Sequence, residues 1–401
     1  MVYLNLSLNL LFTMPMIPQH SEFVNSAPDR IPGLYIHIPF CLTKCHYCNF
    51  YSVTSASLIP RFLAVLFQEM ERVHDQWGPF DTVYIGGGTP SVLTLKQLES
   101  VFLQIQKKFV LLPDTEVTLE VNPGDISPSF LRGLRGIGVN RLNIGVQSFD
   151  QGTLDLLGRR HSAEQAISAI ANSREAGFQN IGLDLIYAVP GQDLGAWRET
   201  LNQALAFSPE HLSCYQLTIE GNTPLGQRYQ KGEFQSSAEE VQYDFFMKTS
   251  EWLEEAGYVH YEVSNFAKTL SFASRHNQKY WNHTPYLGLG PASHSFRDGE
   301  RLWNHSSLDQ YLAAIERGES PVGAKETLTI EQLQLEAFFL GLRTKKGISL
   351  KDLIRGYDFD LIAEKGDALR RLQRDGFLLI KYDTLMPTRA GLAVADSLAL
   401  I

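Results

Sequence analysis

The chain has 401 residues, 44% of them hydrophobic, which indicates two or three structural units with ample material for a core. Its formal net charge of −9 argues against nucleic acid or an acidic membrane surface as the main partner. Four cysteines are too few for a disulfide framework, and no apolar stretch approaches the roughly 18 residues that a transmembrane segment requires.

The N-terminal segment, residues 1–31, is partly apolar but lacks a positively charged start and a clear cleavage site. We therefore expect it to be poorly ordered and not to act as an export signal. Met14 and Met16 are alternative translation starts within it.

Residues 32–266 alternate short stretches rich in Val, Ile, Leu and Tyr with helical stretches. Repeated β–α units predict an α/β fold with a parallel sheet, curled by right-handed crossovers into a partial (β/α)6 TIM-like barrel. The complete eight-unit barrel is the alternative. The predicted strands are Leu34–Ile38, Thr82–Ile85, Glu116–Val121, Arg141–Val146, Ile181–Val189 and His211–Thr218. The predicted helices are Arg61–Trp77, Leu95–Phe109, Pro128–Gly136, Ala163–Ala176, Trp197–Phe207 and Glu239–Ala256.

Residues 267–328 are rich in His, Asn, Trp and Tyr, and we expect an irregular extension that faces a substrate. Residues 329–401 predict three helices, a hairpin and a last helix, an α+β arrangement typical of a winged helix. Acidic residues accompany the three arginines of the third helix, which favours packing or a protein partner over DNA. The predicted elements are Glu331–Leu342, Leu350–Arg355, Leu361–Arg374, Phe377–Lys381, Thr384–Thr388 and Ala390–Ala399.

The most informative motif is the C-x3-C-x2-C triplet of Cys41, Cys45 and Cys48, which follows the first predicted strand. A [4Fe–4S] cluster is normally held by four thiolates, so a triplet suggests one iron open to a non-protein ligand. Structural zinc is the alternative, but it needs a fourth ligand at short spacing. Cys214 stands alone in an apolar stretch and is expected to be a buried strand residue. An oxygen-sensitive cluster fits a reducing cytoplasm.

Together with Tyr35–Cys41 (YIHIPFC) and Gly86–Pro90 (GGGTP), the triplet resembles the radical S-adenosylmethionine (SAM) superfamily. Within it, the chain is similar to the branch of oxygen-independent coproporphyrinogen III oxidase and the HemW-type haem chaperones. The similarity runs from about Pro32 to the C-terminus. It implies that the cysteines bind three irons, that SAM occupies the fourth, and that a reducing electron donor is a partner.

The glycine run Gly86–Gly88 permits close backbone approach, so that N–H and C=O groups can meet a zwitterionic ligand. Arg159 can grip a carboxylate in a fork, and Asp184, inside an apolar strand, needs a polar partner if buried. Three of the matched positions touch a second SAM in the oxidase, so the number of SAM molecules stays open. The SAM contacts that the resemblance implies are Tyr35, Tyr47, Gly87, Gly88, Thr89, Glu120, Gln147, Arg159 and Asp184.

Two departures from the oxidase favour the chaperone. Phe50 stands where the oxidase has a further cysteine, and only about thirty residues precede the first strand. The segment Arg275–Trp281 (RHNQKYW) also resembles the H-N-x-x-Y-W signature of the chaperone, which makes His276 a candidate axial haem ligand. The competing histidines are His283, His294 and His305.

The sequence therefore predicts a cytoplasmic haem chaperone of the radical SAM type. It would bind haem or a porphyrin and pass haem to an acceptor protein that the sequence does not identify. The alternative is coproporphyrinogen III oxidase, which makes protoporphyrinogen IX by radical SAM chemistry.

Overall fold

The computed structural model describes residues 30–398 and 400. The alternative starts Met14 and Met16, and nearly all of the segment expected to be poorly ordered, lie outside the described residues.

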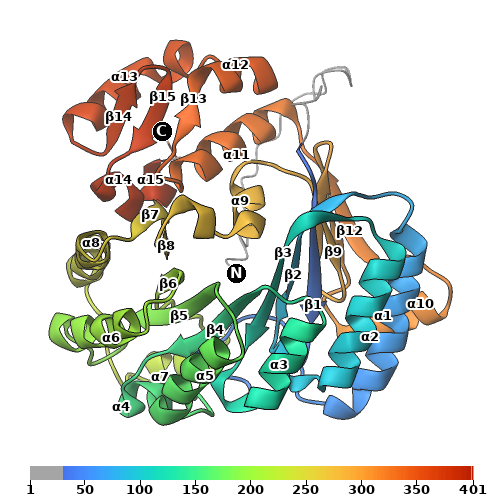
Figure 1. Ribbon diagram of the computed structural model, residues 1–401. Helices are drawn as coiled ribbons and strands as arrows, with labels where there is room; N and C mark the ends of the chain where they lie inside the picture. The colour runs from blue at the N-terminus through green and yellow to red at the C-terminus, as the bar shows by residue number, and fades with distance from the viewer. Residues whose placement is uncertain (1–29, 399, 401) are drawn as a thin grey trace.

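The first part of the chain forms a curled parallel sheet flanked by helices (Figure 1). Six strands lie side by side in chain order and run parallel, which confirms the predicted partial (β/α)6 barrel. In the described residues the sheet ends at β12 on one side and β7 on the other, so the eight-unit alternative is not formed. The six strands are β1 (Gly33–Ile38), β2 (Phe80–Gly87), β3 (Leu111–Val121), β4 (Arg141–Gln147), β5 (Ile181–Tyr187) and β6 (His211–Gln216).

Helices follow the strands and cover the outer face of the sheet (Figure 1). Local signals set several helix starts: Thr94 and Gln97 form a capping box at α2, and the Ser127 side chain caps α3 at its predicted first residue. The helices are α1 (Ile59–Val73), α2 (Leu95–Lys108), α3 (Pro128–Gly136), α4 (Gln151–Leu156), α5 (Ala163–Glu175), α6 (Leu194–Ala206), α7 (Pro224–Gln230) and α8 (Glu239–Glu255).

Side chains alternate along the strands between an apolar outer face and a polar inner face. Leu34, Leu119 and Leu142 are fully buried in the main apolar core, which also contains residues of α1 and α2. At the alternate positions, the Tyr84 hydroxyl donates to Glu120 and other polar side chains bond across neighbouring strands. The barrel interior is therefore a polar network beneath the ends of the strands.

Residues 267–328 differ from the irregular extension that the sequence indicated, because they continue the sheet and add two helices. Strand β9 pairs in parallel with β1, and β10–β12 extend that edge in antiparallel order. These strands have four to six residues each, and pairing with existing strands rather than their own polar sequence decides their conformation. Strands β7 (Val259–Glu262) and β8 (Asn265–Ala267) come just before this segment and extend the opposite edge of the sheet beyond β6. The elements of the segment are α9 (Arg275–Trp281), β9 (Tyr286–Leu289), β10 (His294–Arg297), β11 (Glu300–Asn304), α10 (Leu308–Glu316) and β12 (Val322–Thr327).

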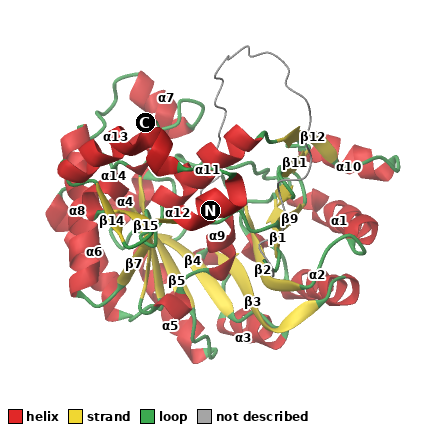
Figure 2. Cartoon of the chain, turned by 90° about the horizontal axis from the view of Figure 1, so that it is seen from above, coloured by secondary structure: helices red, strands yellow, loops and turns green. Residues whose placement is uncertain are grey.

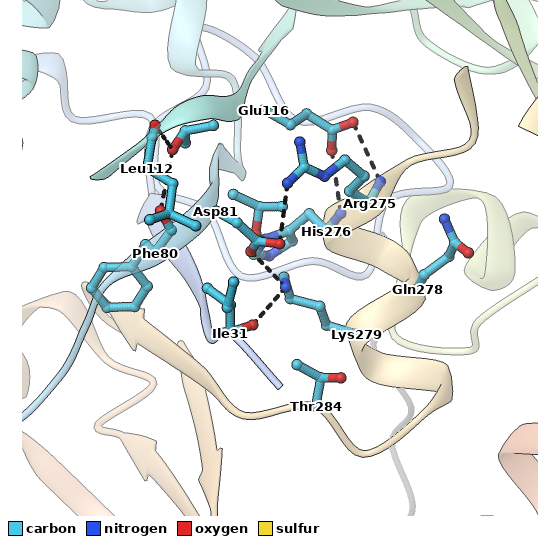
Figure 3. Close-up of polar contacts among 12 residues, drawn as sticks. Ile31, Phe80, Asp81, Leu112, Glu116, Arg275, His276, Gln278, Lys279 and Thr284 are labelled. Carbon is cyan, nitrogen blue, oxygen red and sulfur yellow. Dashed lines mark hydrogen bonds and ion pairs between the residues drawn. The ribbon is translucent and has the colours of Figure 1, made fainter. Parts of the chain in front are cut away.

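Helix α9 closes the end of the barrel at which the strands begin (Figures 2 and 3). The ammonium of Lys279 lies 2.7 Å from the Asp81 carboxylate, and Arg275 lies 3.2 Å from the same carboxylate. Glu116 of β3 accepts from the backbone N–H groups of Arg275 and His276 at the start of α9. The charged residues of α9 and its first N–H groups are thus tied to Asp81 near the start of β2 and to Glu116 within β3.

The C-terminal unit has the winged-helix-like form that the sequence predicted, with a three-stranded sheet in the order β13-β15-β14. It packs against α9, where the Arg343 guanidinium lies 5.3 Å from the Trp281 ring centroid. It therefore lies at the end of the barrel opposite the cysteines. The predicted last helix is split at Val394, and Ala399 lies outside the described residues. The elements are α11 (Ile330–Leu342), β13 (Ile348–Ser349), α12 (Leu350–Tyr357), α13 (Leu361–Arg374), β14 (Leu378–Lys381), β15 (Thr384–Pro387), α14 (Arg389–Ala393) and α15 (Ala395–Leu398).

None of the described helices is both long and apolar enough to cross a bilayer.

The contact between α9 and the barrel predicts a stability effect. Lys279→Met should lower the free energy of unfolding by about 2–3 kcal/mol, because the largely buried Asp81 carboxylate loses its nearest cation. Chemical denaturation measures this change. Lys351→Met is the control, since its ion pair with Asp383 is exposed and should contribute less than about 1 kcal/mol. Equal losses in both variants would contradict the role assigned to Lys279.

Candidate cofactor site

A cavity of about 760 Å³ opens at the end of the barrel where the six parallel strands finish. The parallel direction of the strands brings segments that are distant in sequence to this one rim. Most of the residues predicted from the sequence line the cavity: Cys41, Cys45, Cys48, Tyr47, Gly87, Gly88, Thr89, Glu120, Gln147, Arg159 and Asp184.

The three cysteines are free, partly exposed thiols on one loop that follows β1. The Cys41 sulfur lies 3.4 Å from the Thr89 hydroxyl, and the Arg159 guanidinium donates to the Cys45 sulfur at 3.3 Å. Burial, together with the nearby Cys45 and Cys41 sulfurs, raises the pKa of Cys48 to about 11. Three thiolates at this loop therefore need a cationic centre to share their charge.

The spacing of the cysteines bears on which centre fits. Among residues 30–398, no three His, Cys, Asp or Glu side chains converge closely enough to hold a single metal ion. Each thiolate of a cuboidal iron–sulfur cluster binds a different iron. The three sulfurs are thus compatible with a cluster.

The glycine run after β2 is explained by close contacts inside the protein. A Cβ on Gly87, whose φ is +111°, would lie 2.6 Å from the His37 ring, and a Cβ on Gly88 would lie 2.6 Å from the Phe40 carbonyl oxygen. The N–H groups of Gly87, Gly88 and Thr89 already donate to protein acceptors. The N–H groups of this segment are therefore used in contacts within the protein.

Two carboxylates face the cavity from neighbouring regions of the sheet. Both oxygens of Glu120 are bonded, to the Tyr84 hydroxyl at 2.8 Å and to the Gly87 N–H at 3.2 Å. One oxygen of Asp184 accepts from the Asn143 amide at 2.7 Å, while the other is buried with no hydrogen-bond partner. Burial raises the pKa of Glu120, and the Tyr84 hydrogen bond opposes that rise. Asp184 therefore has an acceptor available for a ligand hydroxyl or ammonium.

Arg159 spans the cavity wall between the cysteine loop and β4. Besides Cys45, it donates to the Gly145 carbonyl oxygen at 2.7 Å, and its Nε is buried with no hydrogen-bond partner. Gln147 ends β4 with a φ of 66°, a left-handed conformation that is uncommon for a residue other than glycine. The Arg159 Nε donor and the Asp184 Oδ1 acceptor are thus both available in the cavity to a zwitterionic molecule.

Tyr35 lies elsewhere than predicted. Its ring is buried in the barrel interior, its hydroxyl lies 3.0 Å from His37 Nδ1, and it does not line the cavity. The inward position that follows from the strand alternation places Tyr35 one layer below the rim, so His37 rather than Tyr35 reaches the cavity.

Sequence reasoning also missed several lining residues. Asn143 and Gly145 lie on the same face of β4 as Gln147, so the two-residue period of that strand was a signal for them. Ala292 comes from the turn between β9 and β10, next to His294, which the sequence analysis had named among the competing histidines; only tertiary pairing brings both to the rim.

The site agrees with known proteins that the chain resembles. Residues 35–204 match the family described as Radical SAM superfamily, and residues 328–394 match the HemN C-terminal domain. The chain is 36% identical to the protein named "Heme chaperone HemW" of Bacillus subtilis over 86% of this chain and 92% of that one. It is 35% identical to the protein of the same name from Synechocystis, over 80% and 79% of the two chains.

The chain belongs to the HemW family of radical SAM proteins. Membership of the radical SAM superfamily implies a [4Fe–4S] cluster and SAM. The cysteine loop, the unpartnered Asp184 oxygen and the unpartnered Arg159 Nε fit those two groups. The fold is shared with coproporphyrinogen III oxidase (HemN) from Escherichia coli, at a TM-score of 0.81 and 22% identity over 92% of this chain and 89% of that one.

The structure places His276, the haem candidate of the sequence analysis, apart from this cavity. His276 is fully buried in the barrel interior, and its ring nitrogens bond to the Thr82 and Tyr280 hydroxyls, both at 2.9 Å. It does not line the cavity. Of the competing histidines, only His294 lines the cavity, and Phe50 lies exposed at the same rim.

The triplet predicts that iron binding depends on each of its cysteines. Anaerobic reconstitution of the parent should give about four irons per chain, and replacing Cys41, Cys45 or Cys48 with alanine should abolish the cluster absorbance. Cys214→Ala is the control, because this buried thiol of β6 lies outside the cavity lining. An intact cluster in all three triplet variants would refute the ligand assignment.

Proposed function

We propose that this protein is a haem chaperone. It holds a [4Fe–4S] cluster through Cys41, Cys45 and Cys48, binds SAM in the adjoining cavity, and binds haem for transfer to an acceptor protein. The observation that carries this proposal is the identity of 35–36% with haem chaperones over about four fifths or more of each chain. A reducing protein would supply the electron to the cluster.

The roles of the cavity residues follow from the polar atoms that have no hydrogen-bond partner within the protein. Asp184 Oδ1 accepts from an ammonium or hydroxyl of SAM, and Arg159 Nε donates to a carboxylate. Glu120, held in place by two donors, lines the same cavity and would contact SAM bound there. When bound, the cluster and SAM supply one-electron chemistry, and the protein supplies orientation and exclusion of water.

His294 is the residue that we assign as the haem ligand. It begins β10 on the cavity wall, and its ring stacks on Trp303 with the ring centroids 5.7 Å apart. Burial lowers the pKa of His294 to about 4, so the imidazole is neutral at physiological pH, as an iron ligand must be. Phe50, with 37% of its surface exposed, offers an apolar contact for a porphyrin face at the same rim.

Haem titration tests this function directly. Haem added to the reconstituted protein should give a saturable Soret shift near one equivalent, and His294→Ala should weaken binding or change the spectrum of the ligated iron. His283→Ala is the control, since His283 bonds to Tyr357 away from the cavity. Absence of a saturable shift in the parent would remove the chaperone proposal.

Coproporphyrinogen III oxidase is the second candidate because the chain shares the fold of the E. coli enzyme over most of its length. Phe50 stands at the cavity rim in the position of the oxidase's additional cysteine. The protein, supplied with SAM, a reductant and coproporphyrinogen III, should therefore form no protoporphyrinogen IX. Decarboxylation of the substrate would favour the oxidase instead.

SAM binding should depend on Asp184. Asp184→Asn keeps the shape of the side chain but removes its charge, and it should weaken SAM binding roughly tenfold at unchanged iron content. Equilibrium titration of the reconstituted protein measures this. Asp155→Asn on the exposed face of α4 is the matched control and should bind SAM as the parent does. Parent-like affinity in Asp184→Asn would refute the assignment.

A further inference from the structure

A chain of contacts joins the H-N-x-x-Y-W segment to the cofactor cavity through the barrel interior. Its central member is Tyr84 of β2, which is 2% exposed. The Tyr84 hydroxyl donates to Glu120 Oε1 at 2.8 Å, and the Gly87 N–H donates to the second oxygen. Tyr84 itself does not line the cavity, whereas Glu120 does. The orientation of the Glu120 carboxylate thus depends on a buried tyrosine one layer below it.

The ring of Tyr84 is in turn supported by α9. The His276 imidazole stacks on it, with the ring centroids 5.2 Å apart and the planes 29° from parallel. Hydrogen bonds to Thr82 and Tyr280 fix both nitrogens of that imidazole. The His276 imidazole therefore has a fixed orientation in which it stacks on the Tyr84 ring.

The position of α9 is itself constrained by charge. Lys279 and Arg275 pair with Asp81 at the start of β2, and Glu116 accepts from the first N–H groups of the helix (Figure 3). A displacement of α9 would break contacts to charged groups that are largely buried, which is costly. The helix is thus a rigid base for the stacked rings.

We propose that Tyr84 is a positioning residue for SAM, and that His276 acts on SAM binding through Tyr84 rather than by ligating haem iron. This inference rests on the proposed placement of SAM beside Glu120. The H-N-x-x-Y-W segment would then support the cofactor site from the opposite end of the barrel. Replacement of His276 should then affect SAM before it affects haem.

The charge state of Glu120 supplies a readout that general destabilisation would not move. The groups facing its carboxylate are the Tyr84 hydroxyl and Gly87 N–H, which lower the pKa of Glu120, and Asp184, which raises it. Arg141 acts on the neighbouring Tyr84, and His276 is neutral because burial lowers its pKa to about 3. Removing the Tyr84 hydroxyl therefore raises the Glu120 pKa further. SAM affinity should then be lost at a higher pH than in the parent as the solution is acidified.

The experiment compares the anaerobically reconstituted parent with Tyr84→Phe, which keeps the stacked ring and removes the hydroxyl. We expect SAM binding to weaken roughly tenfold at neutral pH. On acidification, SAM affinity should be lost at a higher pH than in the parent, and the iron content should stay unchanged. Tyr258→Phe is the matched control, because it loses a buried phenol hydrogen bond, to the Pro209 carbonyl oxygen, away from the cavity. Its SAM affinity and pH profile should equal those of the parent.

Two replacements of His276 complete the test. His276→Ala removes the stack and should weaken SAM binding while the haem Soret titration stays as in the parent. His276→Phe restores a ring over Tyr84 and should recover part of the SAM affinity. A His276→Ala protein that binds SAM normally but loses haem would overturn the inference, as would parent-like SAM binding by Tyr84→Phe. If the parent binds no SAM at all, the proposed function fails together with this inference.

Discussion

The two-residue alternation of side chains along six parallel strands is the constraint on which the rest of the structure depends. Outward positions such as Leu119 and Leu142 bury apolar surface under the helices. Inward positions carry tyrosine, carboxylate and amide groups that bond to one another. The polar interior opens onto the cavity at the end where the parallel strands finish, and α9 closes the other end. The same alternation therefore builds the core and supplies the groups that a cofactor needs.

The two ends of the barrel have different structural roles, and a chain of contacts through Tyr84 joins them. At the rim, the free thiols of the cysteine loop and the unpartnered Oδ1 of Asp184 line the cavity. At the opposite end, α9 and the C-terminal unit seal the interior with buried ion pairs and packed rings. Tyr84 lies between them, stacked on His276 on one side and bonded to the Glu120 carboxylate on the other. Under the proposal made above, these contacts would transmit a change in α9 to the cofactor side.

Much of the fold could be predicted because its signals are local. The capping side chain of Ser127 marked the start of α3, and Asp360 marked the start of α13, both at their predicted first residues. The strands β9–β12 could not be predicted, because these short segments become strands only by pairing with β1 and then with one another. The surroundings of His276 could not be predicted for a similar reason: a histidine next to aromatic residues has the same sequence whether it faces a ligand or, as here, stacks on a buried tyrosine.

The sequence alone determined the cysteine triplet, the repeated β–α pattern and hence the rim at which the triplet lies, since these depend on residue spacing along a parallel sheet. Only the tertiary structure decided which polar atoms at this rim remain without a hydrogen-bond partner. That outcome depends on partners far apart in the chain, such as Asn143 with Asp184 or Tyr84 with Glu120. Burial and pairing across strands set the hydrogen bonding and charge of each group, and neither is encoded by spacing along the chain.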